Sequence, residues 1–345
     1  YDFVRVAFRP ATADERRAEA DTLHESIGSQ LEELTSTEGW ARFLAFATGF
    51  HSYSLSNVLL ILSQRPDASR VAGFRQWQER GRQVRKGERS IKIFGYATKR
   101  TEDENGEEER RAYFPILSVF DVSQTDSIDG EEIPELAPRL IGGDDAGIYD
   151  ATAEWLTGQG WTIDRASTGE ANGFTQHIKR TITIHDELQP AQAAATMLHE
   201  AAHALMHADA DDYHQHRGIY ETEAESVAYI VAGVLGLDTS SKSIGYIAGW
   251  TDGDVETVKS TATRVLATAR TILDGITEHN ERQPEPPSPA AGANEPPPRP
   301  EEISREADLL DRRPPADPRR ARTGVRRAPR GRREGAARHD GAHGG

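Results

Sequence analysis

Cysteine is absent from the 345 residues, and so are long apolar stretches. Without cysteine the chain has neither a disulfide framework nor thiolate ligands for a metal, which fits a reducing cytoplasm. No run of about eighteen apolar residues occurs, so we expect no membrane span. The residues that follow Tyr1 lack the basic-then-apolar pattern of a secretion signal, so we expect no such signal.

Positive charge is scarce over most of the chain and concentrated in two blocks. The net charge is −15, yet residues 41–100 carry 12 Lys+Arg against 3 acids, and residues 312–338 carry 11 Arg against 2 acids. Such blocks in an acidic protein indicate contact with a polyanion. The second block lies in a Pro-, Ala- and Gly-rich tail, where it either adds non-specific polyanion affinity or is only a solvated charge run.

The first half of the chain combines helical and strand patterns. Apolar residues at helical spacing predict helices over residues 12–36, 38–50 and 54–66 and a short helix that ends at Gly81. Strand-like stretches at residues 90–98 and 111–123 flank the acidic, glycine-containing hairpin tip EDENGEEE. We therefore expect an α+β unit here, with Ser54 or Ser56 capping the third helix and Pro66 ending it.

The second half has its own pattern after a stretch rich in Asp, Glu, Pro and Gly. We expect a helix from residue 150, a strand from residue 161 and a strand or hairpin over residues 173–187. Pro190 suits the first turn of the next helix. Further helices are predicted over residues 220–235, 243–250 and 254–276, and disorder beyond residue 281, where aromatics are almost absent.

Residues 196–207 (TMLHEAAHALMH) carry the pattern H-E-x-x-H inside an alanine-rich run that we expect to be helical. Residues four apart share one helical face, so His199 and His203 can chelate one metal ion. Glu200 lies beside that face, where it can take a proton from water on the metal. The pattern also arises by chance on ordinary helices, so a third ligand decides between a metal site and two surface histidines.

Candidates for the third ligand lie downstream. His207 is eight residues from His199, about 12 Å along a helix axis and too far to share one zinc comfortably, so we interpret it as a packing or supporting residue. Three acids, Glu221, Glu223 and Glu225, begin the next predicted helix. Glu221 and Glu225 lie four apart and can both face the first helix. The alternative is that these acids only favour the positive end of a helix dipole.

H-E-x-x-H followed by ETEAE resembles zinc peptidases of the ImmA/IrrE type, which have two histidines and one glutamate as ligands. The resemblance implies that His199, His203 and Glu221 hold Zn²⁺ and that Glu225 supports a ligand histidine. Glu223 is the competing ligand, ranked lower because it would face away from Glu225.

The chemistry expected of such a site is hydrolysis. Three protein ligands leave a fourth position for water, whose pKa zinc lowers toward ~7. Glu200 would act as general base and pass the proton to the leaving amine. The strand RTITIH ahead of the helix is a candidate for pairing with an extended peptide. An oxyanion donor is not singled out, and the candidates are Tyr213, His214, His216 and Tyr220.

The basic block over residues 41–100 interleaves its cations with aromatic residues. Cations that follow a phosphate backbone, with aromatic faces on which bases stack, are what a single-strand binder requires. The alternative is a solvated basic face with Phe74 and Trp77 in the core, and composition alone does not separate the two.

The order of residues in this block resembles the N-terminal domain of the ArdC antirestriction proteins, a single-stranded-DNA-binding domain. The matching stretches are YSLSNVLLI, QRPDASRVAGFRQWQERGRQVRKGERSIKI and VFDVSQT. ArdC proteins carry an ImmA/IrrE-type peptidase domain after this module, which is the order found here. The resemblance covers roughly residues 15–280 and implies DNA contacts from ten residues: Tyr53, Asn57, Arg75, Trp77, Arg80, Arg82, Arg85, Lys86, Arg89 and Lys92.

These patterns predict an α+β, cytoplasmic protein of mobile-element character. We expect a helical and β-hairpin module that binds single-stranded DNA over residues 1–125, a linker over 126–144, a zincin-like metallopeptidase domain over 145–280 and a disordered tail over 281–345. The predicted role is protection of incoming DNA from restriction. One alternative is a peptidase that cleaves a regulatory protein, with DNA as tether or signal. Another is a peptidase fold kept only as a scaffold.

Overall fold

A computed structural model describes residues 12–102, 108–128, 130, 145–208, 213–237 and 254–282, and these ranges belong to one compact unit. The helix expected at residues 243–250, most of the expected linker and the tail beyond residue 282 lie outside the described residues. The mixture of helices and strands confirms the expected α+β class. Within the described ranges no single helix is long and apolar enough to cross a membrane; only the second and third helices taken together reach that length, and a 105° bend separates them.

Three helices open the described part of the chain, each begun by a hydroxyl side chain. Thr12 caps α1 and exchanges hydrogen bonds with Glu15, Ser36 caps α2, and Ser54, one of the two expected caps, begins α3. The stripe expected on the first helix faces the core, with Leu23, Leu31 and Leu34 buried. The helices are α1 (Ala13–Glu33), α2 (Thr37–Phe50), α3 (Leu55–Gln64) and the short α4 (Phe74–Glu79).

Each of the two strand-like stretches in the first half is broken into two strands. The break comes at Gly95, whose amide donates to Pro115 O at 2.7 Å. A Cβ at Gly95 would lie 2.6 Å from Leu117 Cδ1, so a larger residue here would have to displace the Leu117 side chain. The inner strands β3 (Ile91–Phe94) and β6 (Ile116–Asp121) join β1 (Val71–Gly73) in an antiparallel sheet of order β1-β6-β3, and the outer strands β4 (Ala97–Glu102) and β5 (Glu108–Tyr113) form a separate ladder.

A second small ladder closes the first half. After the 3-10 turn Val122–Gln124, strand β7 (Thr125–Ser127) pairs antiparallel with β2 (Arg82–Val84). Residues at the start of the expected linker therefore pair with the basic block.

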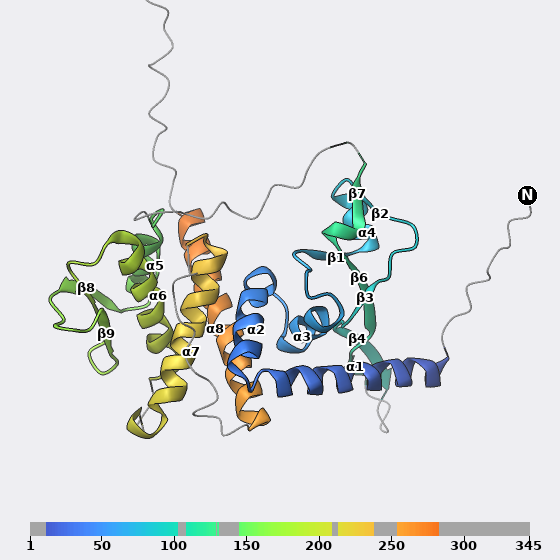
Figure 1. Ribbon diagram of the computed structural model, residues 1–345, viewed down its shortest axis with the longest axis horizontal. Coiled ribbons are helices and arrows are strands. Elements are labelled where there is room, and N and C mark those ends of the chain that lie inside the picture. The colour runs from blue at the N-terminus through green and yellow to red at the C-terminus, as the bar shows by residue number, and fades with distance from the viewer. Residues whose placement is uncertain are drawn as a thin grey trace, which may run out of the picture. The chain divides into compact units, whose positions relative to one another are not determined.

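The second half places four helices together and a three-stranded sheet against one of them (Figure 1). The helices are α5 (Ile148–Gly158), α6 (Pro190–Met206), α7 (Tyr213–Val234) and α8 (Val255–Arg282), and the strands are β8 (Thr162–Ala166), β9 (Gly173–Gln176) and β10 (Thr181–His185). Pro190 stands in the first turn of α6, as expected. In the sheet, β10 is central, parallel to β8 and antiparallel to β9.

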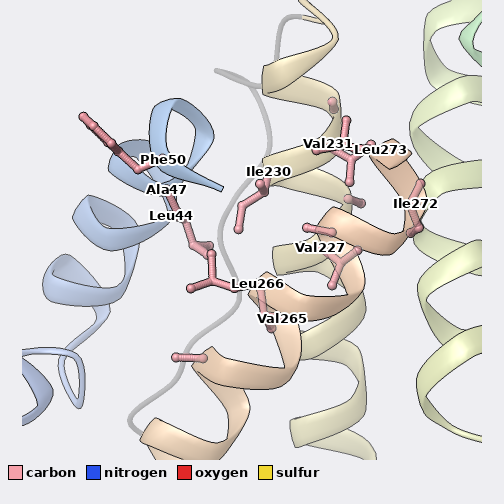
Figure 2. Close-up of a cluster of buried hydrophobic side chains, with 14 of the residues drawn as sticks. Leu44, Ala47, Phe50, Val227, Ile230, Val231, Val265, Leu266, Ile272 and Leu273 are labelled. Atoms are coloured by element: carbon pink, nitrogen blue, oxygen red, sulfur yellow. The ribbon is translucent and has the colours of Figure 1, made fainter. Parts of the chain in front are cut away.

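One apolar core joins the two halves of the compact unit. Figure 2 shows Leu44 and Ala47 of α2 on the side that faces Ile230 of α7, with Leu266 of α8 beside them; Phe50 of α2 belongs to the same core. The approach of α2 to α7 is close, since a Cβ at Gly233 would lie 2.8 Å from Thr48 Cγ2. Trp40, which is fully buried, donates from Nε1 to Ser226 Oγ at 3.1 Å across the same contact.

This close approach predicts a steric effect that a second substitution relieves. Gly233→Ala should lower the free energy of unfolding by roughly 1–3 kcal/mol, because the new methyl group overpacks the contact. Thr48→Ser removes the opposing Cγ2 and keeps the hydroxyl, so the double variant should recover most of the loss. Urea unfolding followed by circular dichroism measures both. The control is Gly28→Ala on α1, where no atom lies within 4 Å; equal destabilisation of both alanine variants would contradict the packing.

Candidate metal centre and the basic face

The two histidines of the H-E-x-x-H pattern meet on one face of α6. His199 Nε2 and His203 Nε2 lie 3.1 Å apart, and both rings face α7. The helix brings them together because residues four apart lie above one another. The alanines of α6 at positions 193, 194, 201 and 202 are buried against the other helices, so the histidine face is held at a fixed orientation.

Glu221 of α7 completes a cluster with the two histidines. Its Oε2 lies 3.5 Å from His199 Nε2 and 3.9 Å from His203 Nε2, and ligand atoms of the three residues lie within 4.8 Å of one another. Two imidazole nitrogens and one carboxylate oxygen are a donor set that a catalytic divalent metal uses. The residues therefore fit a metal ion that keeps an open coordination position.

Glu225 contacts the same histidine from its other side. Its Oε2 lies 3.3 Å from His199 Nδ1. Burial alone would lower the pKa of His199, but hydrogen bonding to Glu221 and Glu225 and the charge of Glu200 together raise that pKa to about 9. The acids thus favour a positive charge at His199, whether it is a proton or a metal ion at Nε2.

Glu200 lies at the same end of the cavity as the cluster. Its side chain is buried, and Thr175 Oγ1 of β9 donates to Glu200 Oε2 at 2.7 Å. This bond holds the carboxylate beside His199 and His203 without neutralising it. Glu200 thus lines the same cavity as the cluster, and its role as a general base stays a prediction.

A cavity of about 910 Å³ opens in front of the cluster, and β9 forms one wall. Gly173, Phe174 and Gln176 line it together with His199 and Glu200. In the sheet β8-β10-β9, the strand at the cavity is the edge strand β9, whereas RTITIH (β10) pairs on both sides. The expectation that RTITIH pairs with a peptide is therefore wrong, since the ladder already uses both of its edges.

His207 and Glu223 contact each other, and His207 also contacts His203 of the three-residue cluster without being one of its members. His207 Nδ1 lies 2.9 Å from His203 Nδ1, and His207 Nε2 lies 3.0 Å from Glu223 Oε2. Burial lowers the pKa of His207, with hydrogen bonding to Glu223 opposing the shift. The supporting position expected for His207 matches this placement, and Glu223 turns toward His207 rather than toward the cluster.

Several residues that line the cavity were missed by the sequence reasoning, among them Thr175, which bonds to Glu200. His177, in the turn between β9 and β10, and Arg217 of α7 both line it. Among the expected oxyanion candidates, Tyr220 packs its ring against His207 at 4.5 Å between centroids, and the side chains of Tyr213, His214 and His216 lie outside the described residues. No sequence pattern connects a hairpin turn with the helix pair, so His177 had no signal.

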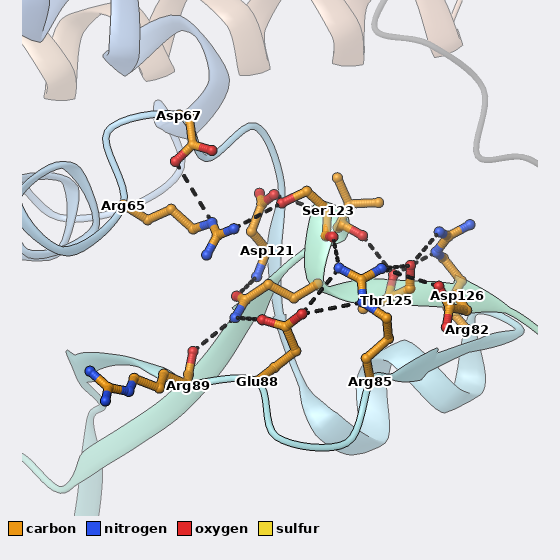
Figure 3. A network of polar contacts seen from close by, with 12 residues as sticks. Arg65, Asp67, Arg82, Arg85, Glu88, Arg89, Asp121, Ser123, Thr125 and Asp126 are labelled. Carbon is orange, nitrogen blue, oxygen red and sulfur yellow. Dashed lines mark hydrogen bonds and ion pairs between the residues drawn. The ribbon is translucent and has the colours of Figure 1, made fainter.

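The basic face of the first half contains cations that already have partners within the protein (Figure 3). Arg82 donates to Thr125, and Arg85 donates to Glu88 and Asp126. These bonds join β2 to β7 and the following loop. The two arginines expected to contact DNA therefore also hold the fold, and their assignment as DNA contacts stays a prediction.

Other expected DNA contacts are also engaged. Trp77 is fully buried and donates to Phe120 O at 2.8 Å, which favours the alternative that it packs in the core. Asn57 exchanges two hydrogen bonds with the backbone of Phe94, and Tyr53 donates to Val71 O. Lys92, likewise, donates to Ser118 Oγ and pairs with Glu19.

Four of the expected cations remain on the surface. Arg75, Lys86 and Arg89 are exposed, and Arg80 lies over the Trp77 ring at 5.6 Å. Phe74 is 43% exposed, contrary to the alternative that buries it, and lines a shallow hollow of about 790 Å³ together with Lys86. Phe74 and Lys86 thus place an exposed ring and an exposed cation at one hollow.

Comparison with known proteins assigns two parts of the chain. Residues 17–122 match the family model of the N-terminal domain of anti-restriction factor ArdC, and residues 164–234 match that of the IrrE N-terminal-like domain, a peptidase family. The chain therefore carries an ArdC-type domain followed by an IrrE-like peptidase-type domain. This confirms the resemblance seen in the sequence; the exact domain boundaries stay a prediction.

The comparison also finds individual proteins that are similar to this chain. The uncharacterised Bacillus anthracis protein pXO2-81 is 25% identical over 323 residues, covering 79% of this chain and 54% of that protein. The chain thus spans about half the length of the curated relative it matches. Two crystal structures of the antirestriction protein ArdC from plasmid R388 are similar to this chain. The metal-free structure has 23% sequence identity and a TM-score of 0.45, and the match covers 65% of this chain and 85% of that one. The Mn(II)-bound structure has 22% identity and a TM-score of 0.42, and the match covers 64% of this chain and 84% of that one.

The network beneath the basic face predicts a stability effect at Asp121. Burial opposes ionisation of this carboxylate, but hydrogen bonds from Ser123, Ser69 and Arg70 outweigh it and hold the pKa of Asp121 below its usual 3.8. Asp121→Asn should therefore lower the free energy of unfolding at neutral pH by about 1–3 kcal/mol.

The sign of the pH dependence follows from the lowered pKa. The stabilisation by Asp121 is present above pH 3.8 and is lost as pH falls through the lower pKa of the folded state. Denaturant unfolding between pH 7 and pH 2 should show a smaller acid loss in Asp121→Asn than in the wild type. Glu79→Gln, at an exposed carboxylate outside this network, is the control; parallel curves for all three proteins would refute the role of Asp121.

Proposed function

We propose that this protein is a single-stranded-DNA-binding protein of the ArdC antirestriction type whose second half carries a zinc-dependent peptide-hydrolysing centre. The observation that carries the proposal is the cluster of His199, His203 and Glu221 beside Glu200 in one cavity, in a chain that begins with an ArdC-type domain. The role that follows is protection of incoming mobile DNA from restriction.

Zinc is the proposed ion because two imidazoles and one carboxylate form a donor set of catalytic zinc sites. When bound by His199, His203 and Glu221, zinc would supply Lewis-acid chemistry that polarises a carbonyl and eases the deprotonation of water. The ArdC protein of plasmid R388 has a Mn(II)-bound structure, so manganese is the ion to compare with zinc.

Glu200 is the residue that moves protons in this proposal. Its carboxylate, oriented by Thr175, accepts a proton from the attacking water as the carbon–oxygen bond forms. It then delivers that proton to the amine nitrogen as the carbon–nitrogen bond breaks. The edge strand β9 supports an extended peptide as the substrate, because an edge strand pairs with a further strand and this one borders the cavity.

Two substitutions in the cavity separate the roles of base and ligand. Glu200→Gln keeps the shape of the side chain and removes the base, so it should lower peptide cleavage by at least about 100-fold while zinc binding persists. Glu221→Ala removes a ligand, so it should lose zinc. Zinc content is measured by mass spectrometry of the purified protein, and cleavage by peptide mapping of an unfolded protein mixture.

The control for both variants is Glu187→Gln, at an exposed carboxylate ahead of α6. Full zinc content in Glu221→Ala would reject Glu221 as a ligand. If Glu200→Gln still protects DNA in cells while cleavage is lost, the peptidase centre is a scaffold for the antirestriction role.

A second candidate function uses the same centre on a protein substrate. The cavity and its edge strand favour a peptidase that cleaves a regulatory protein, with DNA binding as tether or signal. This candidate differs from the antirestriction proposal in the expected behaviour of Glu200→Gln. If the protein acts by cleaving a regulatory protein, this variant should lose protection of DNA in cells although it still binds DNA.

The proposed DNA-binding face rests on the exposed cations and not on the whole basic block. Arg75, Lys86 and Arg89 are exposed, and within the described part of the chain their side chains make no hydrogen bond or ion pair. Phe74 offers an exposed ring near Lys86, where a base can stack. Phosphate contacts by the cations weaken as the salt concentration rises, whereas stacking of a base on the ring does not depend on released counterions.

This difference gives a test of the DNA-binding face. Affinity for an oligo-dT strand should fall with salt at a slope near −0.7 per neutralised phosphate, so the Arg75, Lys86 and Arg89→Ala triple variant should flatten the slope by up to about 2. Phe74→Ala should weaken binding by about 1–3 kcal/mol with the slope unchanged. Fluorescence anisotropy at several salt concentrations measures both effects.

A charge-matched control replaces three exposed cations elsewhere, Arg17, Arg42 and Lys259, by alanine. The account predicts a near wild-type slope for this control. Equal flattening in the two triple variants would mean that net charge alone, and not this face, attracts the strand.

A further inference from the structure

A row of polar side chains leads away from the metal cluster into the interior of the protein. His207 is 1% exposed and Glu223 is 0% exposed in their side chains. The row runs from His203 Nδ1 to His207 Nδ1 at 2.9 Å, and from His207 Nε2 to Glu223 Oε2 at 3.0 Å. Arg264 Nη2 of α8 lies 3.3 Å from the same carboxylate oxygen.

The chemistry of these groups allows only one arrangement of protons along the row when Glu223 is ionised and His207 is neutral. A carboxylate oxygen only accepts, so Nε2 of His207 carries its proton and donates to Glu223. Nδ1 of His207 then accepts, and the donor in that bond is Nδ1–H of His203. The proton on Nδ1 leaves the lone pair of His203 at Nε2, the nitrogen that faces His199 and Glu221.

Burial of the Glu223 carboxylate costs free energy unless ion pairs and hydrogen bonds offset the loss of hydration. A buried carboxylate loses its hydration, and an apolar residue of similar size at this position would avoid that penalty. Its second oxygen, Oε1, is buried without a hydrogen-bond partner in the described part of the chain. The contacts that Glu223 does make are the ion pair with Arg264 and the bond to His207, so the acid acts on His207.

We propose that His207, Glu223 and Arg264 form a positioning chain that holds His203 in the tautomer and orientation needed to bind the metal. The inference rests on the proposed metal centre and adds three residues that neither the ligand set nor the general base includes. The chain connects α6, α7 and α8, so the ligand is oriented by the packing of three helices. In metal sites a ligand histidine commonly donates its other ring N–H to a carboxylate or carbonyl; here a second histidine stands between the ligand and the acid.

Zinc affinity is the first quantity to measure, because loss of the positioning chain should weaken zinc binding although none of its residues is a zinc ligand. His207→Phe keeps a buried ring and removes both hydrogen bonds, so it should weaken zinc binding by about 10–100-fold. Glu223→Gln keeps the shape and an accepting oxygen, so its loss should be smaller. Competition with a chromophoric chelator measures the affinities, and circular dichroism with thermal melting of the metal-free proteins checks that each variant folds.

The matched control is Thr152→Ala, which removes a buried hydroxyl of α5 that bonds to Ile148 O within its own helix and not to the histidines. Its zinc affinity should stay within about twofold of the wild type, given that distant sites act independently. Wild-type affinity in both His207→Phe and Glu223→Gln would overturn the chain and leave the metal centre standing. Failure of the wild type itself to bind zinc would overturn the metal centre and the chain together.

A second readout does not depend on any variant. Nitrogen-15 NMR of the zinc-loaded wild type reports which ring nitrogen carries a proton, and the chain predicts Nδ1–H for His203 and Nε2–H for His207. In Glu223→Gln the His207 signals should shift. A zinc-bound nitrogen on His207, or a proton on its Nδ1, would contradict the positioning chain directly.

Discussion

Burial of the apolar face of α7 is the constraint on which the candidate metal centre depends. Val227, Ile230 and Val231 are fully buried against α2 and α8, which fixes the rotation of this helix about its axis. With the rotation fixed, Glu221 and Glu225, one turn apart, both face His199. The same packing turns the intervening Glu223 inward to His207.

The contact between α2 and α7 connects the two halves of the compact unit. Helix α2 belongs to the part that matches the ArdC domain and α7 to the part that matches the IrrE-like domain. The bond from Trp40 to Ser226 ends one residue beyond Glu225, which contacts a proposed ligand histidine. Helix α2 is therefore bonded directly to the helix that supplies the acids of the candidate metal centre.

The sequence predicted best where a local rule decides the structure. Helical spacing predicted α1, α2 and α3, a cap at Ser54 or Ser56 was predicted for α3, and the four-residue spacing brought His199 and His203 together. Tertiary contacts decided the rest. No local sequence pattern indicates that Trp77 is buried and Phe74 exposed, or that Arg82 donates a hydrogen bond to Thr125. These contacts depend on strands that lie far along the chain. The edge position of β9 depends on β10 pairing with β8, which alternation within one strand does not reveal.

The central claim is that two histidines and one glutamate bind the metal while His207 orients one of them. X-ray absorption spectroscopy of the zinc-loaded protein tests it most directly, because the scattering pattern of imidazole rings counts the histidine ligands. The account predicts two imidazoles with the remaining ligands oxygen, and zinc–nitrogen distances of about 2.0–2.1 Å. Three imidazoles at the metal would make His207 a ligand and contradict the account.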